Sequence, residues 1–221
     1  MEIGDYFALA SVRAPLPDGR WVQLTVVDLG ELHVESGLIG ACDPYVNLDA
    51  PLVIPVPSGH YPIRVTYADL SEAQDGSLWR EAYLSVVLSE SEAASLEPAP
   101  SLDGAPDPGR YRGIEVDAGT VAFVDAEAVP RCMPGNRVNW RTDIFNSGKP
   151  DSWFAQADRD GPQPVGTANI VLPLATRGEN VILARAGYGD DGFYALERTL
   201  AADGTVTGIH IDFQVIGLPE E

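Results

Sequence analysis

The sequence has few basic residues. It contains 14 lysines and arginines against 33 aspartates and glutamates, which gives a formal net charge of −19 and a pI near 4.3. A field of this sign repels nucleic acids and anionic membrane surfaces, so we expect neither as a partner. It favours capture of a basic protein or of a cation, although acidity of this kind also serves simply to keep a protein soluble.

Cysteine is also scarce. The two cysteines, Cys42 and Cys132, form no CxxC pair, which excludes a disulfide framework. No stretch approaches the roughly 20 apolar residues of a membrane-spanning helix. The first residues lack the basic and apolar regions of a secretory signal, so we expect a cytoplasmic protein.

Signals for helices are few, and alternation of apolar and polar residues prevails, which predicts strands. The predicted strands are 21–28, 61–67, 82–88, 113–125, 169–174, 180–186 and 205–216. One short helix is predicted at 89–96, where a serine can cap the first turn. The sequence therefore predicts a mostly β fold with few short helices, either a β-sandwich or an open β-barrel. A two-lobed arrangement of the same strands is the alternative.

Two stretches interrupt this pattern, although we expect one β-rich domain over residues 1–221. Residues 97–110 include four prolines and are predicted to be an internal linker or a long surface loop that separates a first sheet from a second. Residues 130–164 are irregular and contain Trp140, Trp153 and Phe154. We expect these aromatic side chains to pack on the core, because large aromatic residues bury much apolar area.

Common catalytic motifs are absent. The sequence has no Gly-x-Ser-x-Gly elbow, no His-Glu-x-x-His pair and no Gly-x-x-x-x-Gly-Lys loop. Its three histidines, His33, His60 and His210, are not paired at the sequence spacing of metal ligands. His210 alternates with Asp212 in the last predicted strand, so both side chains are expected on one face, in a ligand site or a cross-strand hydrogen bond.

The densest polar cluster is at residues 186–194. Its glycines permit unusual backbone angles, and its adjacent aspartates suit a hard cation or an ordered water. The candidate ligand-binding residues are Gly187, Tyr188, Gly189, Asp190, Asp191 and Tyr194, with Asp190 and Asp191 as candidate metal ligands. A hairpin loop whose aspartates bond their own backbone is the competing interpretation.

Other aspartates flank predicted strands. Asp117 and Asp125 are eight residues apart, so a regular strand over 113–125 would place both on one face. Asp43 stands before a proline in a turn-like segment. Such carboxylates suit acid–base or metal chemistry, and they equally cap turns. The candidate catalytic residues are Asp43, Asp117, Asp125, Asp190, His210 and Asp212.

Several segments, taken in order, resemble the signature blocks of one bacterial family. They are 36–44 (SGLIGACDP), 57–62 (PSGHYP), 116–125 (VDAGTVAFVD), 187–194 (GYGDDGFY) and 212–213, within roughly residues 30–216. The family is the domain of unknown function 4241. The resemblance implies a single mostly β domain in a bacterial cytoplasm, and it implies no particular reaction. The chain departs from the usual pattern at Ala186, where a serine is common, and at the additional acid Asp191.

Two functions compete. The absence of a catalytic constellation favours a non-catalytic binding or interaction protein with a basic protein partner, and an immunity or antitoxin-like protein is one form of it. The alternative is a metal-assisted hydrolase, which requires that several of the candidate aspartates converge in space. No cofactor is expected for the first function, and a divalent cation for the second.

Overall fold

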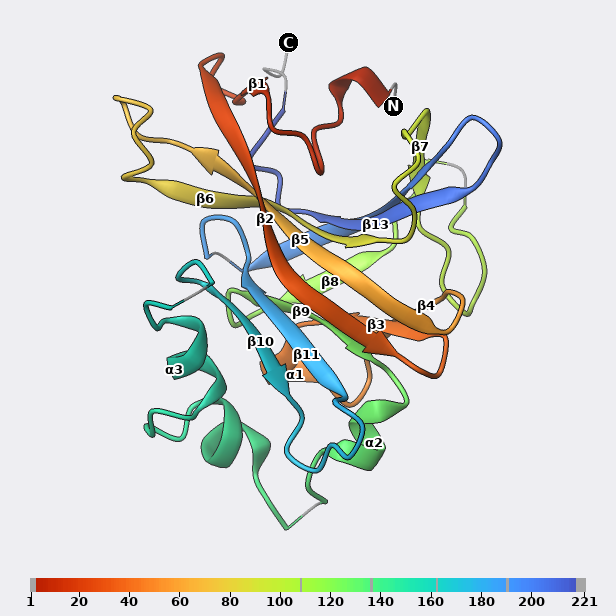
Figure 1. Cartoon of the computed structure of the whole chain (residues 1–221), viewed down its shortest axis with the longest axis vertical. Coiled ribbons are helices and arrows are strands. Elements are labelled where there is room, and N and C mark those ends of the chain that lie inside the picture. Colours follow the sequence, from red (N-terminus) through yellow and green to blue (C-terminus); the bar gives the residue numbers. More distant parts are fainter. Residues whose placement is uncertain (1–2, 108, 136, 162, 190, 218–221) are drawn as a thin grey trace.

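The computed structural model describes residues 3–107, 109–135, 137–161, 163–189 and 191–217 (Figure 1). The strands are β1 (Arg13–Pro15), β2 (Trp21–Val34), β3 (Leu38–Cys42), β4 (Leu52–Pro55), β5 (Gly59–Asp69), β6 (Trp79–Val87), β7 (Ser95–Pro98), β8 (Gly113–Val116), β9 (Thr120–Asp125), β10 (Thr167–Val171), β11 (Asn180–Arg185), β12 (Gly192–Leu200) and β13 (Val206–Asp212). The helices are all short: η1 (Ile3–Asp5), α1 (Pro44–Asn47), α2 (Ala128–Cys132), η2 (Arg141–Phe145) and α3 (Trp153–Ala157).

The described strands form two antiparallel sheets, which confirms the predicted β-sandwich. One sheet has eight strands in the order β1-β2-β5-β6-β13-β12-β7, with β8 also paired to β12, and the other has five in the order β10-β11-β9-β3-β4. The core between them combines Leu24, Ile63 and Leu84 of the larger sheet with Phe123 and Ile182 of the smaller one. Burial of these alternate side chains from water holds the two sheets together.

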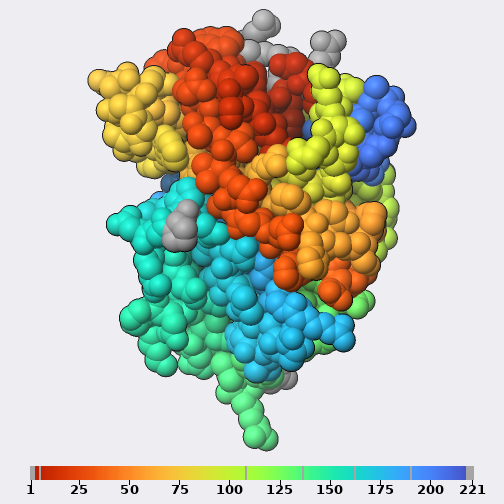
Figure 2. All heavy atoms as spheres, in the orientation of Figure 1, coloured from red at the N-terminus to blue at the C-terminus, as the bar shows by residue number. Residues whose placement is uncertain are grey.

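Helices α1, α2, η2 and α3 cover the other face of the five-stranded sheet and form one end of the molecule, whereas η1 lies with the N-terminal segment at the opposite end (Figures 1 and 2). Val124 and Leu183 of this sheet belong to a second hydrophobic cluster with Phe145 and Trp153. The rings of Phe145 and Trp153 meet edge to face, with centroids 4.6 Å apart. Trp153 is buried in this cluster, and Trp140 and Phe154 are partly buried against it, which confirms the prediction that these three aromatic side chains pack on a core.

The predicted strand over 113–125 is wrong as a single element. The chain leaves the eight-stranded sheet after β8 and joins the five-stranded sheet at β9. The change of direction occurs at Gly119, which has a φ of +60° that glycine adopts without strain. Asp117 and Asp125 therefore do not share one face of one strand.

The helix predicted at 89–96 is also wrong. Residues 89–94 are irregular, and Ser95 begins β7, which pairs with β12 at the edge of the larger sheet. Pairing with a neighbouring strand outweighs the weak local preference of a short serine- and alanine-rich segment for helix.

The proline-rich segment 97–110 does not separate the two sheets, because each sheet contains strands from both sides of it. Its first part lies against the fold. Ala99 is buried, and the Leu102 backbone N–H donates to the Val53 carbonyl at 3.0 Å. The assignment of residues 1–221 to a single domain stays a prediction.

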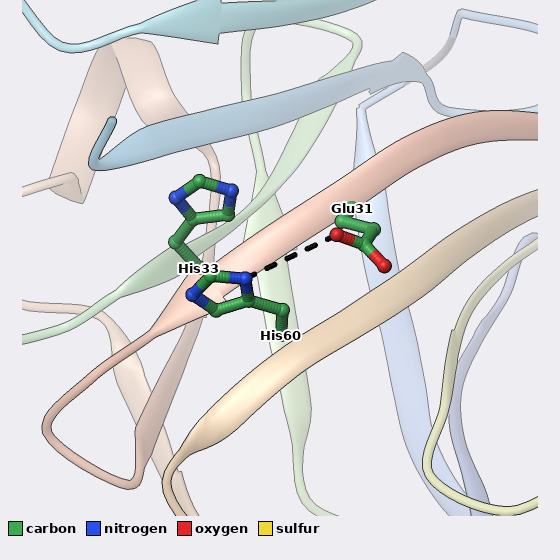
Figure 3. Close-up of side chains that lie close together, drawn as sticks. All are labelled: Glu31, His33 and His60. Atoms are coloured by element: carbon green, nitrogen blue, oxygen red, sulfur yellow. Dashed lines mark ion pairs between the residues drawn. The ribbon is translucent and has the colours of Figure 1, made fainter. Parts of the chain in front are cut away.

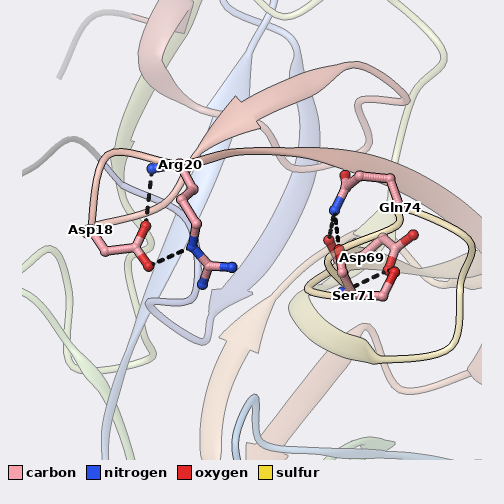
Figure 4. A network of polar contacts seen from close by, with 5 residues as sticks. All are labelled: Asp18, Arg20, Asp69, Ser71 and Gln74. Atoms are coloured by element: carbon pink, nitrogen blue, oxygen red, sulfur yellow. Dashed lines mark hydrogen bonds and ion pairs between the residues drawn. The ribbon is translucent and has the colours of Figure 1, made fainter.

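The loop between β5 and β6 is built around a buried carboxylate (Figure 4). Asp69 accepts hydrogen bonds from the Ser71 hydroxyl at 2.6 Å and the Gly76 backbone N–H at 2.8 Å. Gln74 donates to the Asp69 carbonyl at 2.7 Å. Burial alone would raise the pKa of Asp69, but the hydrogen bonds from Ser71 and Gly76 together outweigh it and lower this pKa.

Candidate functional site

The glycine-rich segment 187–194 connects β11 to β12. Tyr188 and Asp191 are exposed, whereas Tyr194 is buried and its ring meets that of Phe213 at a centroid distance of 5.6 Å. Asp190 lies outside the described residues, so its assignment as a catalytic residue or metal ligand stays a prediction. The described part of this segment brings no second carboxylate to Asp191.

The glycines of this segment have a packing role. A Cβ atom on Gly119 would lie 2.6 Å from the carbonyl oxygen of Gly189. The Ala186 backbone N–H also donates to the Gly119 carbonyl at 2.9 Å. The turn before β9 and the loop after β11 therefore touch backbone to backbone, which leaves no room for a side chain at Gly119. Gly187, by contrast, is buried against Phe213.

Asp43 is fully buried and accepts three backbone hydrogen bonds. Its Oδ1 accepts the N–H of Tyr45 at 2.9 Å, as the N-cap of α1. Its Oδ2 accepts the N–H groups of Asp117 at 2.9 Å and Ala118 at 2.8 Å. The Asp43 carboxylate therefore contacts the backbone of Asp117, whereas the Asp117 side chain is exposed. This geometry gives Asp43 a structural role.

The carboxylate of Asp125 also accepts several local hydrogen bonds. Its Oδ1 accepts the Ser36 hydroxyl at 2.6 Å and the N–H of Glu127 at 2.9 Å, and its Oδ2 accepts the Ser36 N–H at 2.9 Å. The carboxylate ties the turn before β3 to the start of α2. Both carboxylates are buried and already hold their full complement of local donors, which leaves little capacity for a metal or a substrate.

His210 and Asp212 lie in the other sheet, away from this group of aspartates. His210 is buried, and its ring nitrogens are 2.9 Å from Thr199 Oγ1 and 2.9 Å from Ser85 Oγ. Burial lowers the pKa of His210 to about 3, so the ring is neutral at physiological pH. It is a core histidine with both nitrogens bonded.

Sequence reasoning missed the acidic cluster around Asp212. Glu197 lies opposite His210 in the pairing of β12 with β13, and its Oε2 has no hydrogen-bond partner among the described residues. Tyr6, from the N-terminal segment, covers this face with its ring 5.2 Å from Tyr83. Burial, with the charge of Glu197 adding to it, raises the pKa of Asp212 to about 7. Burial also raises the pKa of Glu197.

A groove of about 680 Å³ lies on the helical layer. Leu48, Val129, Met133 and Phe145, all buried, lie at its base, and Trp140 stands at its side. Helix α1, helix α2, the loop that follows α2 and helix η2 all contribute to its walls. In the sequence, this groove was indicated only by the aromatic residues within 130–164.

The polar side of the groove is organised around Arg141. The Arg141 Nε donates to the Tyr45 carbonyl at 3.1 Å, and its guanidinium carbon lies 5.5 Å from the centroid of the Tyr45 ring. The Trp140 indole N–H donates to the Pro134 carbonyl at 2.8 Å, which fixes the orientation of the indole. Arg141 forms no ion pair with a described acidic residue, so its outer nitrogens can receive an anionic group.

The charge of this layer differs from that of the whole chain. Residues 131–159 contain five basic and three acidic residues, whereas the whole chain carries a net charge of −19. The lining of the groove itself contains one basic residue, Arg141, and one acidic residue, Asp49.

The fold brings together two histidines whose sequence spacing does not indicate a shared site. His33 and His60 are not close in sequence, but they are direct partners in the pairing of β2 with β5, and Glu31 lies close to both. Strand register, which the spacing of residues does not reveal, brings them together.

The fold and the groove define a β-sandwich protein with a helical layer that carries a ligand-sized cavity. No helix among the described residues is long and apolar enough to cross a membrane. The chain belongs to the family described as protein of unknown function (DUF4241), whose model matches residues 32–211, as the resemblance in the sequence indicated. Comparison with curated proteins and with solved structures gives no match.

Proposed function

We propose that the protein is a non-catalytic binding protein and that the groove of the helical layer holds its ligand. The observation that carries this proposal is the groove itself, with a volume of about 680 Å³. Ligand pockets typically span about 300–1,000 Å³ and combine an apolar lining with a few placed polar groups. Leu48, Phe145 and Met133 supply the apolar part here, and Arg141 supplies the polar group.

The ligand that fits this lining is a chain segment with a large apolar side chain next to a carboxylate. The apolar side chain packs between Trp140 and the base of the groove. The carboxylate pairs with Arg141, whose planar guanidinium is held against Tyr45 and is already oriented. Tryptophan and arginine side chains of this kind supply much of the binding energy in protein interfaces.

A strongly basic segment fits the groove less well, because Arg141 would repel it. The basic protein partner favoured by the net charge of −19 therefore stays a prediction, and the overall charge supports it through faster encounter rather than through contacts in the groove. An immunity or antitoxin-like role is one form of such a binding function.

The hydrolase alternative has less support. It needs several free carboxylates in one place, whereas Asp43 and Asp125 are occupied by backbone donors and Asp212 lies in the other sheet. Asp190 lies outside the described residues, so a role for it stays a prediction.

The test is selection from a random-peptide library on the immobilised protein, followed by affinity measurement of the enriched peptides. We expect the peptides to share an aromatic or large aliphatic residue beside Asp or Glu. Trp140→Ala should weaken binding by about tenfold or more, equivalent to at least ~1.4 kcal/mol. Trp21→Ala is the matched control, because Trp21 is an exposed tryptophan of β2 outside the groove, and it should leave the affinity unchanged.

Charge reversal sharpens the test. Arg141→Glu should abolish binding of the selected peptides and restore it for peptides whose acidic residue is changed to lysine. Absence of enrichment, or equal binding to the wild type and to both groove variants, would contradict the proposal.

A further inference from the structure

Three potential metal ligands converge where β2 pairs with β5 (Figure 3). His33 and His60 are opposite each other in this pairing, and Glu31 precedes His33 by two residues, so its side chain projects from the same face of β2. Leu32 and Val34, which alternate with them, are buried in the core. The strand pattern therefore directs all three ligand groups to one side of the sheet.

The three groups are close enough to share one ion. One ligand atom of each lies within 4.8 Å of the others, and His60 Nδ1 is 4.0 Å from a carboxylate oxygen of Glu31. The rings of His33 and His60 are stacked, with centroids 4.1 Å apart and planes 6° from parallel. Bonds of about 2.0–2.2 Å from each ligand to a common ion require the two stacked rings to turn about their side-chain bonds, so that one nitrogen of each points at the ion.

An independent observation points to a missing partner at this position. The Nδ1 atom of His33 is buried and has no hydrogen-bond partner among the described residues. A buried nitrogen left unpaired is costly, and each such atom in a folded protein calls for an explanation. This nitrogen faces the loop before β11, where a Cβ on Gly178 would lie 3.2 Å from it, so a turn of the His33 ring toward Glu31 and His60 would let an ion satisfy it.

The backbone that presents the ligands is held from the neighbouring sheet. The Asn180 side chain accepts the N–H of His33 at 3.0 Å and donates to the carbonyl of Glu31 at 2.8 Å. Asn169 in turn accepts a hydrogen bond from Asn180 at 2.7 Å. A Cβ on Gly178 would lie 3.0 Å from the His33 ring, so the loop before β11 lies close against this ring. A backbone fixed in this way holds the three side chains on neighbouring positions, which favours a metal site.

We propose that Glu31, His33 and His60 bind one divalent transition-metal ion of the zinc class, with the remaining coordination position open to water. Two imidazoles and one carboxylate suit zinc, nickel, copper or ferrous iron, whereas calcium and magnesium prefer sets of oxygen ligands. Glu31 and His60 are exposed, which leaves an entry path for the ion. The net charge of −19 raises the local concentration of cations.

The number of histidines makes the test direct. The chain has only three, and the third, His210, is buried and bonded through both ring nitrogens. We expect Zn²⁺, added to chelator-treated protein, to shift the NMR ring signals of His33 and His60 and to leave those of His210 in place. Ca²⁺ at the same concentration should shift none of them. A Zn²⁺ titration that leaves all three ring signals unchanged would overturn the proposal.

Variants distinguish binding of Zn²⁺ at this site from the general attraction of cations to an acidic surface. Glu31→Gln and His60→Ala change exposed side chains, so both proteins should fold, and each should lower the Zn²⁺ affinity measured by calorimetry by at least about tenfold. Glu35→Gln is the matched control, because Glu35 is an exposed acid just beyond β2 and outside the cluster, and its affinity should equal that of the wild type. Equal loss in the control, or full affinity in both site variants, would refute the assignment.

Discussion

Replacement of Asp212 by asparagine should stabilise the protein at neutral and basic pH. Asp212 ends β13 beneath the N-terminal segment, in the same acidic cluster as Glu197. Burial, reinforced by Glu197, raises its pKa from 3.8 to about 7. Its Oδ1 accepts one hydrogen bond, from the Gln214 backbone N–H at 2.7 Å, and asparagine keeps an oxygen that can accept the same bond.

The magnitude follows from the difference between the folded and unfolded pKa values. A group whose pKa is raised on folding contributes stability that is fully present below its unfolded pKa and is lost as the pH rises through the folded pKa. A difference of about three pKa units corresponds to a loss of about 4 kcal/mol in the free energy of unfolding between pH 4 and pH 8. Asp212→Asn removes this loss.

Urea denaturation followed by tryptophan fluorescence at a series of pH values measures the effect. At about pH 8 the midpoint of the variant should exceed that of the wild type by about 2 M, given a denaturant slope of ~2 kcal/mol/M. At about pH 4 the two midpoints should agree, because both side chains are then neutral. Asp160→Asn, at an exposed position, is the control and should change neither midpoint. A gain that is the same at both pH values, or no gain at pH 8, would refute the reasoning.

Three further substitutions test contacts that shape the fold. Asp43→Ala leaves three backbone N–H groups without their acceptor and should cost about 3–5 kcal/mol, whereas Asp117→Ala, at an exposed side chain, should cost less than about 0.5 kcal/mol. Phe145→Ala removes a buried ring from the base of the groove and should cost about 3–5 kcal/mol. Gly119→Ala places a Cβ 2.6 Å from a backbone oxygen at a positive φ and should cost about 1–3 kcal/mol. Thermal melts measure all three, at about 2–4 °C per kcal/mol, and an unchanged melting temperature would contradict the corresponding contact.

Most of the strands could be predicted from the sequence because they alternate. The segments 21–28, 61–67, 82–88 and 180–186 correspond to β2, β5, β6 and β11. Alternation does not specify which strands pair, however. For this reason the sequence did not predict that β8 and β9 belong to different sheets, or that residues 95–98 pair with β12.

The candidate sites were harder to predict, because each depends on residues distant in sequence. Asp43 stood out as an acid before a proline and Asp125 as an acid at the end of a predicted strand, and the structure shows both carboxylates holding local hydrogen bonds. His33 and His60 lacked any signal in their spacing, because their proximity arises from the register of β2 against β5. The surroundings of Glu197 include Tyr6 of the N-terminal segment, which is distant from it in sequence.

The buried acids of this chain oppose one another in their effect on stability, and together they predict its pH optimum. Asp212 and Glu81, whose pKa values burial raises to about 7, stabilise the fold at low pH and lose this contribution as the pH rises. Hydrogen bonds from the Arg177 and Thr176 backbone lower the pKa of Glu179 to about 2, so its contribution is present above its ordinary pKa of 4.5 and is lost as the pH falls. The contribution of these three groups should therefore be greatest near pH 4.5 and should decline from there to about pH 7. A double variant, Asp212→Asn with Glu81→Gln, should flatten this decline and leave the decline below about pH 4.5 unchanged, whereas wild-type stability that rises between pH 4.5 and pH 7 would contradict the burial of these two carboxyl groups.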